Sequence, residues 1–433
     1  EGQARHEGVQ PCAGAVQRHG GETRALLLAA EHAQLQEQEL VETEAAAGLD
    51  GSGWGGGPFL EAAEEFTWRP DVRIGTRIDM SDIEFDYDRQ TGNLFLVTGY
   101  PGLSGDNRWA VWISTDGGYS WTKTYDWVNP DYYVCEVMHV AASVCGDYLY
   151  VAYIHRSRGS GSKPWLYDLL VRRFFVTNGA PDWSYHSTSC ADCRDIVGVH
   201  CLPGGDFGES PVPRSIAMTS NADGADNSMF LFAVLDDYRV LFWRGDAASG
   251  AWGQFPCPII NAAYGLDAAY CYLGTYMLYL SYVGYNIGLS GSATTAALNP
   301  LCVARYDGYN WNVTEVEPNP RLGAATRVSA YREWVMTVYE YDLFTYGVGV
   351  RYRVSYDGGD SWKVGTVAAP TSDRQYQRPD VTARQNRGFA VSYLERNPMI
   401  DQCYFRWRDY GDGTPGSAPW SSPSLVSTKY AVF

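Results

Sequence analysis

The chain has 433 residues, 50 acidic side chains against 33 basic ones and a formal net charge of −17. This charge argues against a nucleic-acid partner, because phosphate binding needs a basic surface. No apolar run approaches the ~20 residues that a membrane-spanning helix requires. The 32 Tyr, 15 Trp, 15 Phe and 46 Gly suit half-buried strands joined by tight turns, and they favour an all-β protein.

The first region in chain order differs in composition from the rest. Residues 22–47 are rich in Ala, Glu, Gln and Leu, which have good helix propensity, but their apolar positions are too sparse for a core face. Residues 51–58 form a Gly-rich linker. We therefore expect residues 1–57 to be a helical or disordered N-terminal leader, with disorder favoured, and residues 58–433 to form the main domain.

Six segments rich in β-forming residues recur along the main domain, and each is expected to be the second strand of a repeat. They are Leu94–Val97, Leu149–Ala152, Met229–Phe232, Met277–Leu280, Val335–Val338 and Phe389–Ser392. A short strand precedes each segment, and a hairpin with a closing Trp follows it. These Trp residues are Trp121, Trp183, Trp252, Trp311, Trp362 and Trp420. Four antiparallel strands repeated six times around an axis predict a six-bladed β-propeller. Residues 66–74 or 426–432 can supply the strand that closes the ring.

Two of the hairpins are near copies of each other. Residues Ser114–Trp121 and Ser355–Trp362 both read S-x-D-G-G-x-S-W. The two Gly suit a turn with positive φ, the Ser and Asp side chains can bond its backbone, and the Trp can tuck beneath it. Both segments resemble the Asp-box of sialidases and many other exported propellers. The resemblance implies an exported protein, extracellular or at the cell surface, whose acidic surface keeps it soluble and can hold Ca²⁺.

Charged residues recur where the first strands start and the second strands end, and these positions meet on one face of a propeller. The basic residues before or at the first strands are Arg77, Arg214, Arg327 and Arg378, and the ends of second strands add Asp236, Glu340, Glu395 and Arg396. A ring of guanidinium groups suits a carboxylate, because the planar fork binds it bidentately. The carboxylates are candidate acid–base partners. The alternative is a solvated salt-bridge network that only supports the loops.

The Asp-box repeats make residues 66–433 similar to the sialidase superfamily. That resemblance implies cleavage of terminal sialic acids with an Arg triad, a Tyr nucleophile assisted by a Glu, and an Asp acid/base. It assigns the triad to Arg214, Arg327 and Arg378, and the nucleophile to Tyr376. The acid/base falls on Asp106, with Glu340 and Asp236 as further catalytic candidates. The family carries Arg-Ile-Pro in its first blade, whereas this chain reads Arg-Ile-Gly at residues 73–75, so a clear catalytic signature is missing.

The sequence therefore predicts an exported propeller that binds an acidic glycan or another anionic ligand on its central face. The enzyme alternative is a divergent sialidase-like exo-glycosidase. A third hypothesis is a structural subunit of a surface assembly or filament. No cofactor is required by any of these hypotheses, and no metal ligands are assigned.

A Cys- and His-rich segment is expected to lie in an insertion between blades two and three. It contains His186, Cys190, Cys193, His200 and Cys201. The spacing suits Zn²⁺, but a disulfide staple is favoured in an exported protein. Cys135 and Cys145 flank the first strand of blade two, where an extended strand keeps them roughly 30 Å apart, so they are not expected to pair.

Overall fold

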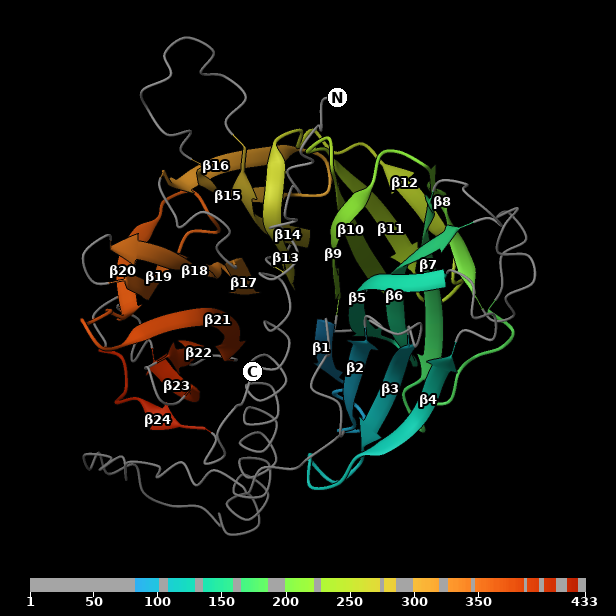
Figure 1. Ribbon diagram of the computed structural model, residues 1–433, viewed down its shortest axis with the longest axis horizontal. Helices are drawn as coiled ribbons and strands as arrows, with labels where there is room; N and C mark the ends of the chain where they lie inside the picture. Colours follow the sequence, from blue (N-terminus) through green and yellow to red (C-terminus); the bar gives the residue numbers. More distant parts are fainter. Residues whose placement is uncertain are drawn as a thin grey trace, which may run out of the picture.

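The computed structural model describes residues 82–100, 108–128, 135–158, 165–185, 199–221, 227–272, 276–285, 299–318, 326–343, 347–384, 388–396, 401–409 and 419–426. These residues form six four-stranded antiparallel sheets arranged around a central axis (Figure 1). The predicted six-bladed β-propeller is therefore confirmed. The expected leader and linker, residues 1–57, lie outside the described residues.

Each blade is built from four strands in chain order. Blade 1 has β1 (Asp82–Tyr87), β2 (Leu94–Tyr100), β3 (Arg108–Ser114) and β4 (Thr122–Val128). Blade 2 has β5 (Cys135–Cys145), β6 (Tyr148–Arg158), β7 (Trp165–Phe175) and β8 (His200–Gly208). Blade 3 has β9 (Pro213–Ser220), β10 (Ser228–Leu235), β11 (Val240–Asp246) and β12 (Trp252–Phe255).

The second half of the ring repeats this plan. Blade 4 has β13 (Ala262–Tyr272), β14 (Tyr276–Gly284), β15 (Leu301–Tyr306) and β16 (Trp311–Glu317). Blade 5 has β17 (Thr326–Tyr331), β18 (Trp334–Leu343), β19 (Gly347–Ser355) and β20 (Lys363–Ala368). Blade 6 has β21 (Gln375–Arg384), β22 (Gly388–Arg396), β23 (Asp401–Asp409) and β24 (Ser424–Leu425). Within the described residues every sheet uses consecutive strands. The segments expected to close the ring, residues 66–74 and all but the first residue of 426–432, lie outside this part of the chain.

The core is a series of apolar layers between neighbouring blades. All eight residues of β10 are buried, because a second strand is covered on both faces by the adjacent blades. Aromatic rings fill these layers. The Trp109 ring of blade 1 lies 5.1 Å from that of Tyr153 in blade 2, and the Tyr352 ring of blade 5 lies 5.5 Å from that of Trp420 in blade 6. Burial of such rings on both faces of each sheet stabilises the ring of blades.

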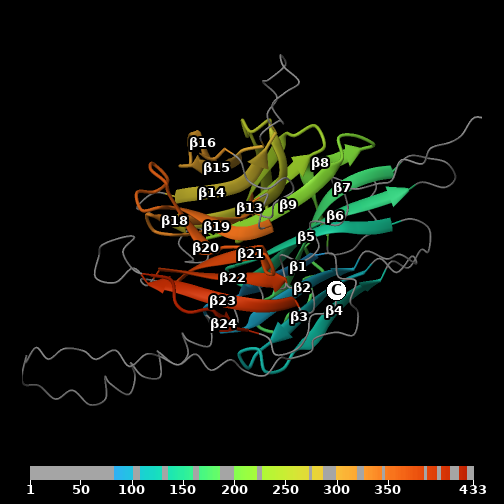
Figure 2. The ribbon, with the colours of Figure 1, turned by 60° about the vertical axis from the view of Figure 1, so that its left-hand side comes forward.

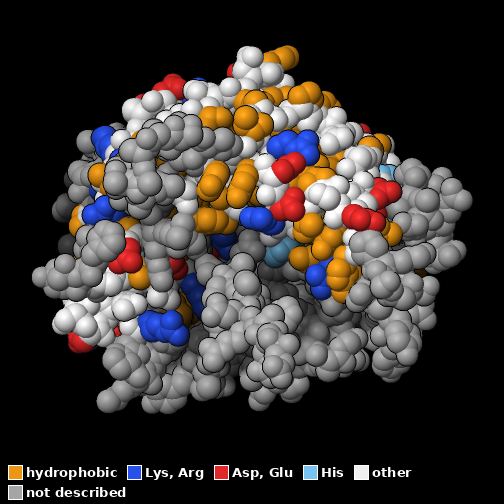
Figure 3. All heavy atoms as spheres, turned by 45° about the horizontal axis from the view of Figure 1, so that its top comes forward, with side chains coloured by type: hydrophobic (Ala, Val, Ile, Leu, Met, Phe, Trp, Pro, Cys, Tyr) orange, Lys and Arg blue, Asp and Glu red, His pale blue; other side chains and the backbone are white. Residues whose placement is uncertain are grey.

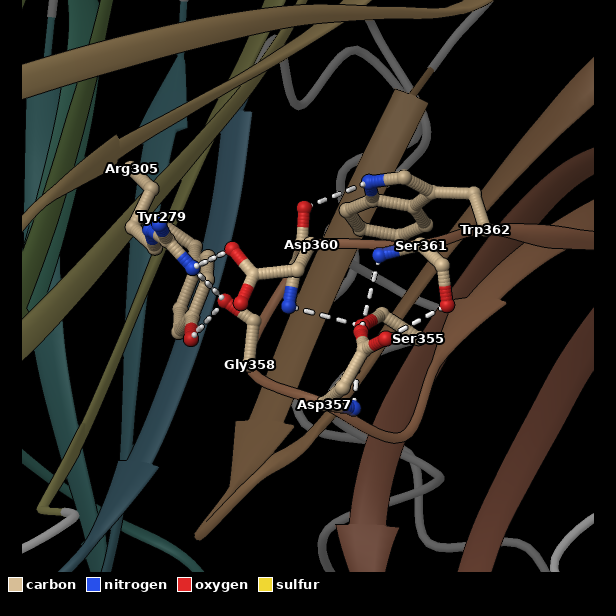
Figure 4. A network of polar contacts seen from close by, with 9 residues as sticks. Tyr279, Arg305, Ser355, Asp357, Gly358, Asp360, Ser361 and Trp362 are labelled. Atoms are coloured by element: carbon tan, nitrogen blue, oxygen red, sulfur yellow. Dashed lines mark hydrogen bonds and ion pairs between the residues drawn. The ribbon is translucent and has the colours of Figure 1, made fainter.

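The S-x-D-G-G-x-S-W hairpin of blade 5 has the geometry predicted from its residues (Figure 4). Gly358 and Gly359 have φ of 70° and 95°, a region in which a side chain is strained. The Ser355 hydroxyl donates to Asp357 Oδ1 at 2.7 Å and accepts from the Gly359 N–H at 2.7 Å. The Asp357 carboxylate accepts from the Ser361 N–H at 2.9 Å. The hairpin of blade 1 has the same hydrogen bonds at Ser114, Asp116, Gly118 and Ser120.

Blade 4 fastens the blade 5 hairpin from the side. Arg305 Nη1 donates to the Gly358 carbonyl and to Asp360 Oδ1, both at 2.7 Å. The Tyr279 hydroxyl donates to the same carbonyl at 3.0 Å. Figure 4 shows the guanidinium and the phenol converging on this turn. The turn therefore joins two blades as well as two strands.

Two predictions about blade 2 need correction. Trp183 does not tuck beneath its hairpin but is 54% exposed, because its ring lies against the Arg172 guanidinium and near Tyr125 of blade 1. His200 and Cys201 begin β8, the fourth strand of blade 2, and are not part of an insertion between blades. His186, Cys190 and Cys193 lie outside the described residues.

Among the cysteines of the described part of the chain, four are buried and two are partly exposed: Cys145, Cys201, Cys271 and Cys302 are buried, and Cys257 and Cys403 are partly exposed. Across the same residues, no group of three or more His, Cys, Asp or Glu side chains is placed to hold a metal ion. This part of the chain also contains no helix with the length and apolarity needed to cross a membrane.

Candidate functional site

The first strands begin, and the second strands end, on one face of the propeller, which we call the entry face. The loops between blades and the loops between second and third strands emerge there, whereas the S-x-D-G-G-x-S-W hairpins connect strands on the opposite face. The views in Figures 1 and 2 show the strands running between these two faces. In the space-filling view, basic and acidic side chains gather with hydrophobic ones around a hollow (Figure 3). Such convergent loops are the usual place for ligand contacts.

Most of the predicted site residues that the structure describes meet where blades 5 and 6 adjoin. We call this group the blade 5–6 cluster. It comprises Arg327 of β17, Glu340 of β18, Arg374 before β21, Tyr376, Arg378 and Asp380 of β21, and Glu395 of β22. Arg374 and Asp380 were not predicted as site residues: the packing of blade 6 on blade 5 brings Asp380 to Arg327, and the fold of blade 6 brings Arg374 to Glu395.

The backbone of Arg378 adopts a left-handed conformation. Its φ is 52°, an uncommon value for a residue with a side chain. The Arg378 N–H donates to Glu340 Oε1 at 2.7 Å, and Glu340 is only 6% exposed. This buried carboxylate, predicted as an acid–base candidate, therefore accepts a main-chain hydrogen bond and holds the strained backbone of Arg378 in place.

The ion pairs of the cluster are loose. Arg327 Nε lies 3.8 Å from Asp380 Oδ1, and Arg374 Nη1 lies 3.5 Å from Glu395 Oε1. By contrast, Arg305 lies 2.7 Å from Asp360 in the hairpin of blade 5. Charge-assisted hydrogen bonds between guanidinium and carboxylate groups are about 2.7–2.9 Å long. The separations in the two pairs of the cluster are thus longer than those of charge-assisted hydrogen bonds. An entering anion can therefore displace the carboxylate of each pair from its arginine.

Tyr376 lies directly opposite Glu395 in the pairing of β21 with β22. Burial raises the pKa of the Tyr376 hydroxyl, and the negative charge of Glu395 raises it further, while Arg374 opposes the shift. The Tyr376 ring also packs edge-on against Tyr393, at 5.6 Å between ring centroids. The phenol is therefore neutral near pH 7 and has a carboxylate beside it.

The third predicted triad member, Arg214, lies elsewhere on the entry face. It is exposed at the start of β9 in blade 3, with its Cζ 5.6 Å from the centre of the Tyr238 ring. Asp236 accepts a hydrogen bond from the Val212 N–H at 3.0 Å and donates its own N–H to the Val212 carbonyl at 2.8 Å. Asp236 thus supports the loop that leads to Arg214.

The remaining predicted residues have different outcomes. Arg396 ends β22 and is exposed next to the cluster. Arg77 and Asp106 lie outside the described residues, so their predicted roles stay predictions. The aromatic residues Tyr238 and Tyr285 of the entry face were missed. Aromatic residues within loops after second strands are the signal that could have found them.

Comparisons with known proteins find no match in sequence and several distant matches in structure. No protein-family model matches the chain, and no curated protein matches it in sequence. The structure of the SapL1 lectin in complex with alpha methyl fucoside has a TM-score of 0.44 and 13% identity, over 80% of this chain and 96% of that one. AofleA from Arthrobotrys oligospora has a TM-score of 0.45 and 10% identity, over 80% and 86%. A Trypanosoma rangeli sialidase in complex with 2,3-difluorosialic acid has a TM-score of 0.44 and 11% identity, over 76% and 53%. These are distant structural matches, so the interpretation of the site depends on its own geometry.

Proposed function

We propose that the protein is an exported propeller that binds an acidic glycan through the blade 5–6 cluster. The observation that carries this proposal is the combination of loose ion pairs with a strained arginine. Arg327 and Arg374 face carboxylates at 3.8 and 3.5 Å, and Arg378 is held in a left-handed conformation by Glu340. Strained backbone of this kind tends to occur where a side chain must be presented to a ligand.

The proposed mode of binding is exchange of one carboxylate for another. A carboxylate or sulfate of the glycan approaches Arg327 and Arg374 and accepts hydrogen bonds from their guanidinium groups, which lie 3.8 and 3.5 Å from the carboxylates of Asp380 and Glu395. The half-buried Tyr376 contributes a neutral hydroxyl that can donate to a sugar oxygen. Because the chain carries a net charge of −17, an anion gains from these local contacts and not from the overall field.

A glycan array of sialylated, uronic-acid and sulfated glycans, each printed beside its neutral counterpart, tests the proposal. The assay is run with and without Ca²⁺, because a calcium requirement is untested. We expect acidic glycans to bind in preference to neutral ones, and Arg327→Ala to abolish that preference. The matched control is Arg89→Ala, since Arg89 is exposed in the turn between β1 and β2 on the opposite face.

Equal binding of acidic and neutral glycans, or an Arg327→Ala variant that binds like the wild type, contradicts the proposal. Absence of binding in both classes favours the third hypothesis, a structural subunit of a surface assembly. Light scattering of the same sample at increasing concentration then tests assembly directly.

The pairing of Tyr376 with Glu395 favours a second candidate function, hydrolysis of an acidic glycoside. In this candidate Glu395 takes the phenol proton as the Tyr376 oxygen attacks the anomeric carbon, which compensates for the raised pKa of the phenol. The glycosidic C–O bond breaks in the same step, and the aglycone leaves as an alcohol after taking a proton from solvent. Water then replaces the Tyr376 oxygen at the anomeric carbon, and the proton held by Glu395 returns to the phenol. A fluorogenic sialoside assay tests it. Release of the fluorophore that is lost in Tyr376→Phe supports hydrolysis, and release that persists in this variant, or no release, rejects it.

A further inference from the structure

A second feature of the entry face is a stack of three side chains at the boundary of blades 3 and 4. The Arg214 guanidinium lies over the Tyr238 ring, at 5.6 Å from its centre. Tyr285 also stacks on Tyr238, with 4.6 Å between the ring centroids and 5° between the ring planes. Tyr285 remains 39% exposed, so part of its ring is open to solvent. The stack combines flat apolar surface with a positive charge.

Main-chain hydrogen bonds between the blades hold the two rings in position. Tyr238 has a left-handed φ of 68°, and its carbonyl accepts from the Ala262 N–H at 2.9 Å. The Tyr285 N–H donates to the Asn261 carbonyl at 2.5 Å. Both tyrosines are thus pinned to residues 261 and 262, where the chain enters blade 4. A tyrosine at a position where Gly or Asn would be unstrained indicates that the ring itself is used.

A hollow of about 360 Å³ begins at Arg239, the residue that follows Tyr238, and lies between the start of β11, the end of β12 and the loop that follows. Phe255 and Ile260 line it and are 42% and 61% exposed. Arg239 also lines the hollow and supplies a charged group, and it is held by Asp237 at 2.7 Å. The volume is near the lower end of the range for ligand sites, about 300–1,000 Å³, and it suits one or two sugar rings.

This chemistry matches an acidic sugar residue. The C–H face of a pyranose is apolar and can pack on an aromatic ring, while its hydroxyls and carboxylate need polar partners such as Arg239 in the hollow and Arg214 in the stack. The stack and the blade 5–6 cluster both lie where first strands begin and second strands end, so they share the entry face.

We propose that the blade 3–4 boundary is a second subsite for another acidic sugar of the same ligand. The ligand class is then a linear acidic polysaccharide and not a single terminal sugar. This inference rests on the proposed function, and it adds that binding strengthens once an oligosaccharide is long enough to reach both places.

Titration calorimetry with two probe series tests the inference: α2,8-linked sialic acid oligomers and oligogalacturonates, each from one to twelve residues. We expect affinity to rise roughly 100-fold above a threshold length in the wild type. Tyr285→Ala and Tyr238→Asn should bind the shortest oligomers like the wild type but lose the rise. Asn is chosen because it tolerates the left-handed backbone while removing the ring. Tyr309→Ala is the matched control, because Tyr309 is 91% exposed in a hairpin on the opposite face.

The outcomes separate the inference from the proposed function. Short oligomers that bind without any gain at greater length overturn the second subsite and leave the proposed function intact. A gain that persists in Tyr285→Ala and Tyr238→Asn also overturns it, because the stack is then only packing between blades. Failure of every oligomer to bind overturns the inference, and it overturns the proposed function as well only if the array also shows no preference for acidic glycans. Urea unfolding of each variant checks that the fold is retained.

Discussion

Replacing Arg378 by glycine separates a ligand-binding role of its side chain from a structural one. The left-handed backbone of Arg378 costs about 1–2 kcal/mol for a residue with a Cβ, and glycine removes that cost. Glycine also gives the unfolded chain more freedom, which costs about 0.5–1 kcal/mol. Any partly exposed ion pair of the side chain is worth about 0–1 kcal/mol. We therefore expect Arg378→Gly to change the free energy of unfolding by less than about 1 kcal/mol.

The same variant should lose glycan binding. A hydrogen bond to a charged group contributes about 1.5–3 kcal/mol, which corresponds to a rise in Kd of about 10- to 100-fold. Urea unfolding measures the first quantity, and titration with the acidic glycan identified on the array measures the second. Arg378→Ala is the control, since it removes the guanidinium but keeps the strain, and it should be less stable than the glycine variant.

Two results would refute this reasoning. Destabilisation by more than about 2 kcal/mol in Arg378→Gly would show that the guanidinium is part of the core of the fold, because exposed ion pairs do not contribute that much. Retention of wild-type affinity would show that Arg378 does not contact the ligand, whatever its backbone conformation.

Three further predictions concern residues that support the fold and the cluster. Glu340→Ala should cost about 1–3 kcal/mol in urea unfolding and weaken glycan binding, because the buried Arg378 N–H loses its acceptor, whereas Glu340→Gln keeps an acceptor oxygen and should retain both. Burial raises the pKa of Asp357, but the hydrogen bonds from Ser361 and Ser355 outweigh it and lower the pKa to about 2. The Asp357 carboxylate should thus add about 1 kcal/mol to the free energy of unfolding, after allowance for solvent screening. This contribution is present above pH 4 and is lost between about pH 4 and pH 2. Asp357→Asn should remove this part of the acid dependence, and an unchanged acid transition would contradict the assignment. Arg305→Ala should lower stability by about 1–3 kcal/mol through loss of its hydrogen bonds to the blade 5 hairpin, and a Tm equal to that of the wild type would contradict the role of the turn in joining blades.

The architecture could be predicted from the sequence because its determinants are local. A strand such as Leu94–Val97 and the turn that contains Gly358 and Gly359 are recognisable within a few residues, and the structure confirms both. Trp183 shows the limit of this reasoning, since its spacing follows the other hairpins but its side chain is exposed. Whether a Trp is covered depends on the course of the neighbouring chain, which no local pattern contains.

The candidate site could be predicted only in part. The recurrence of arginine at the starts of first strands identified Arg327 and Arg378, and the structure brings them to adjoining blades. The same recurrence grouped Arg214 with them, whereas the structure places it beside Tyr238 in blade 3. Equivalent positions in different blades share a face of the ring, and the contacts that each side chain makes there depend on how its own blade packs against the next.

The amino-acid pattern alone is sufficient to predict a ring of six four-stranded blades, and the structure confirms it. Periodic strands, Gly-containing turns and repeated hairpins are sufficient for that, because each blade is encoded by contiguous residues. Three contacts are visible only in the tertiary structure. Glu340 accepts a hydrogen bond from the Arg378 N–H, Asp380 lies 3.8 Å from Arg327, and Tyr285 stacks on Tyr238. Each of these pairs joins neighbouring blades, and contacts between blades arise from packing of one sheet against the next, which leaves no spacing signal in the chain.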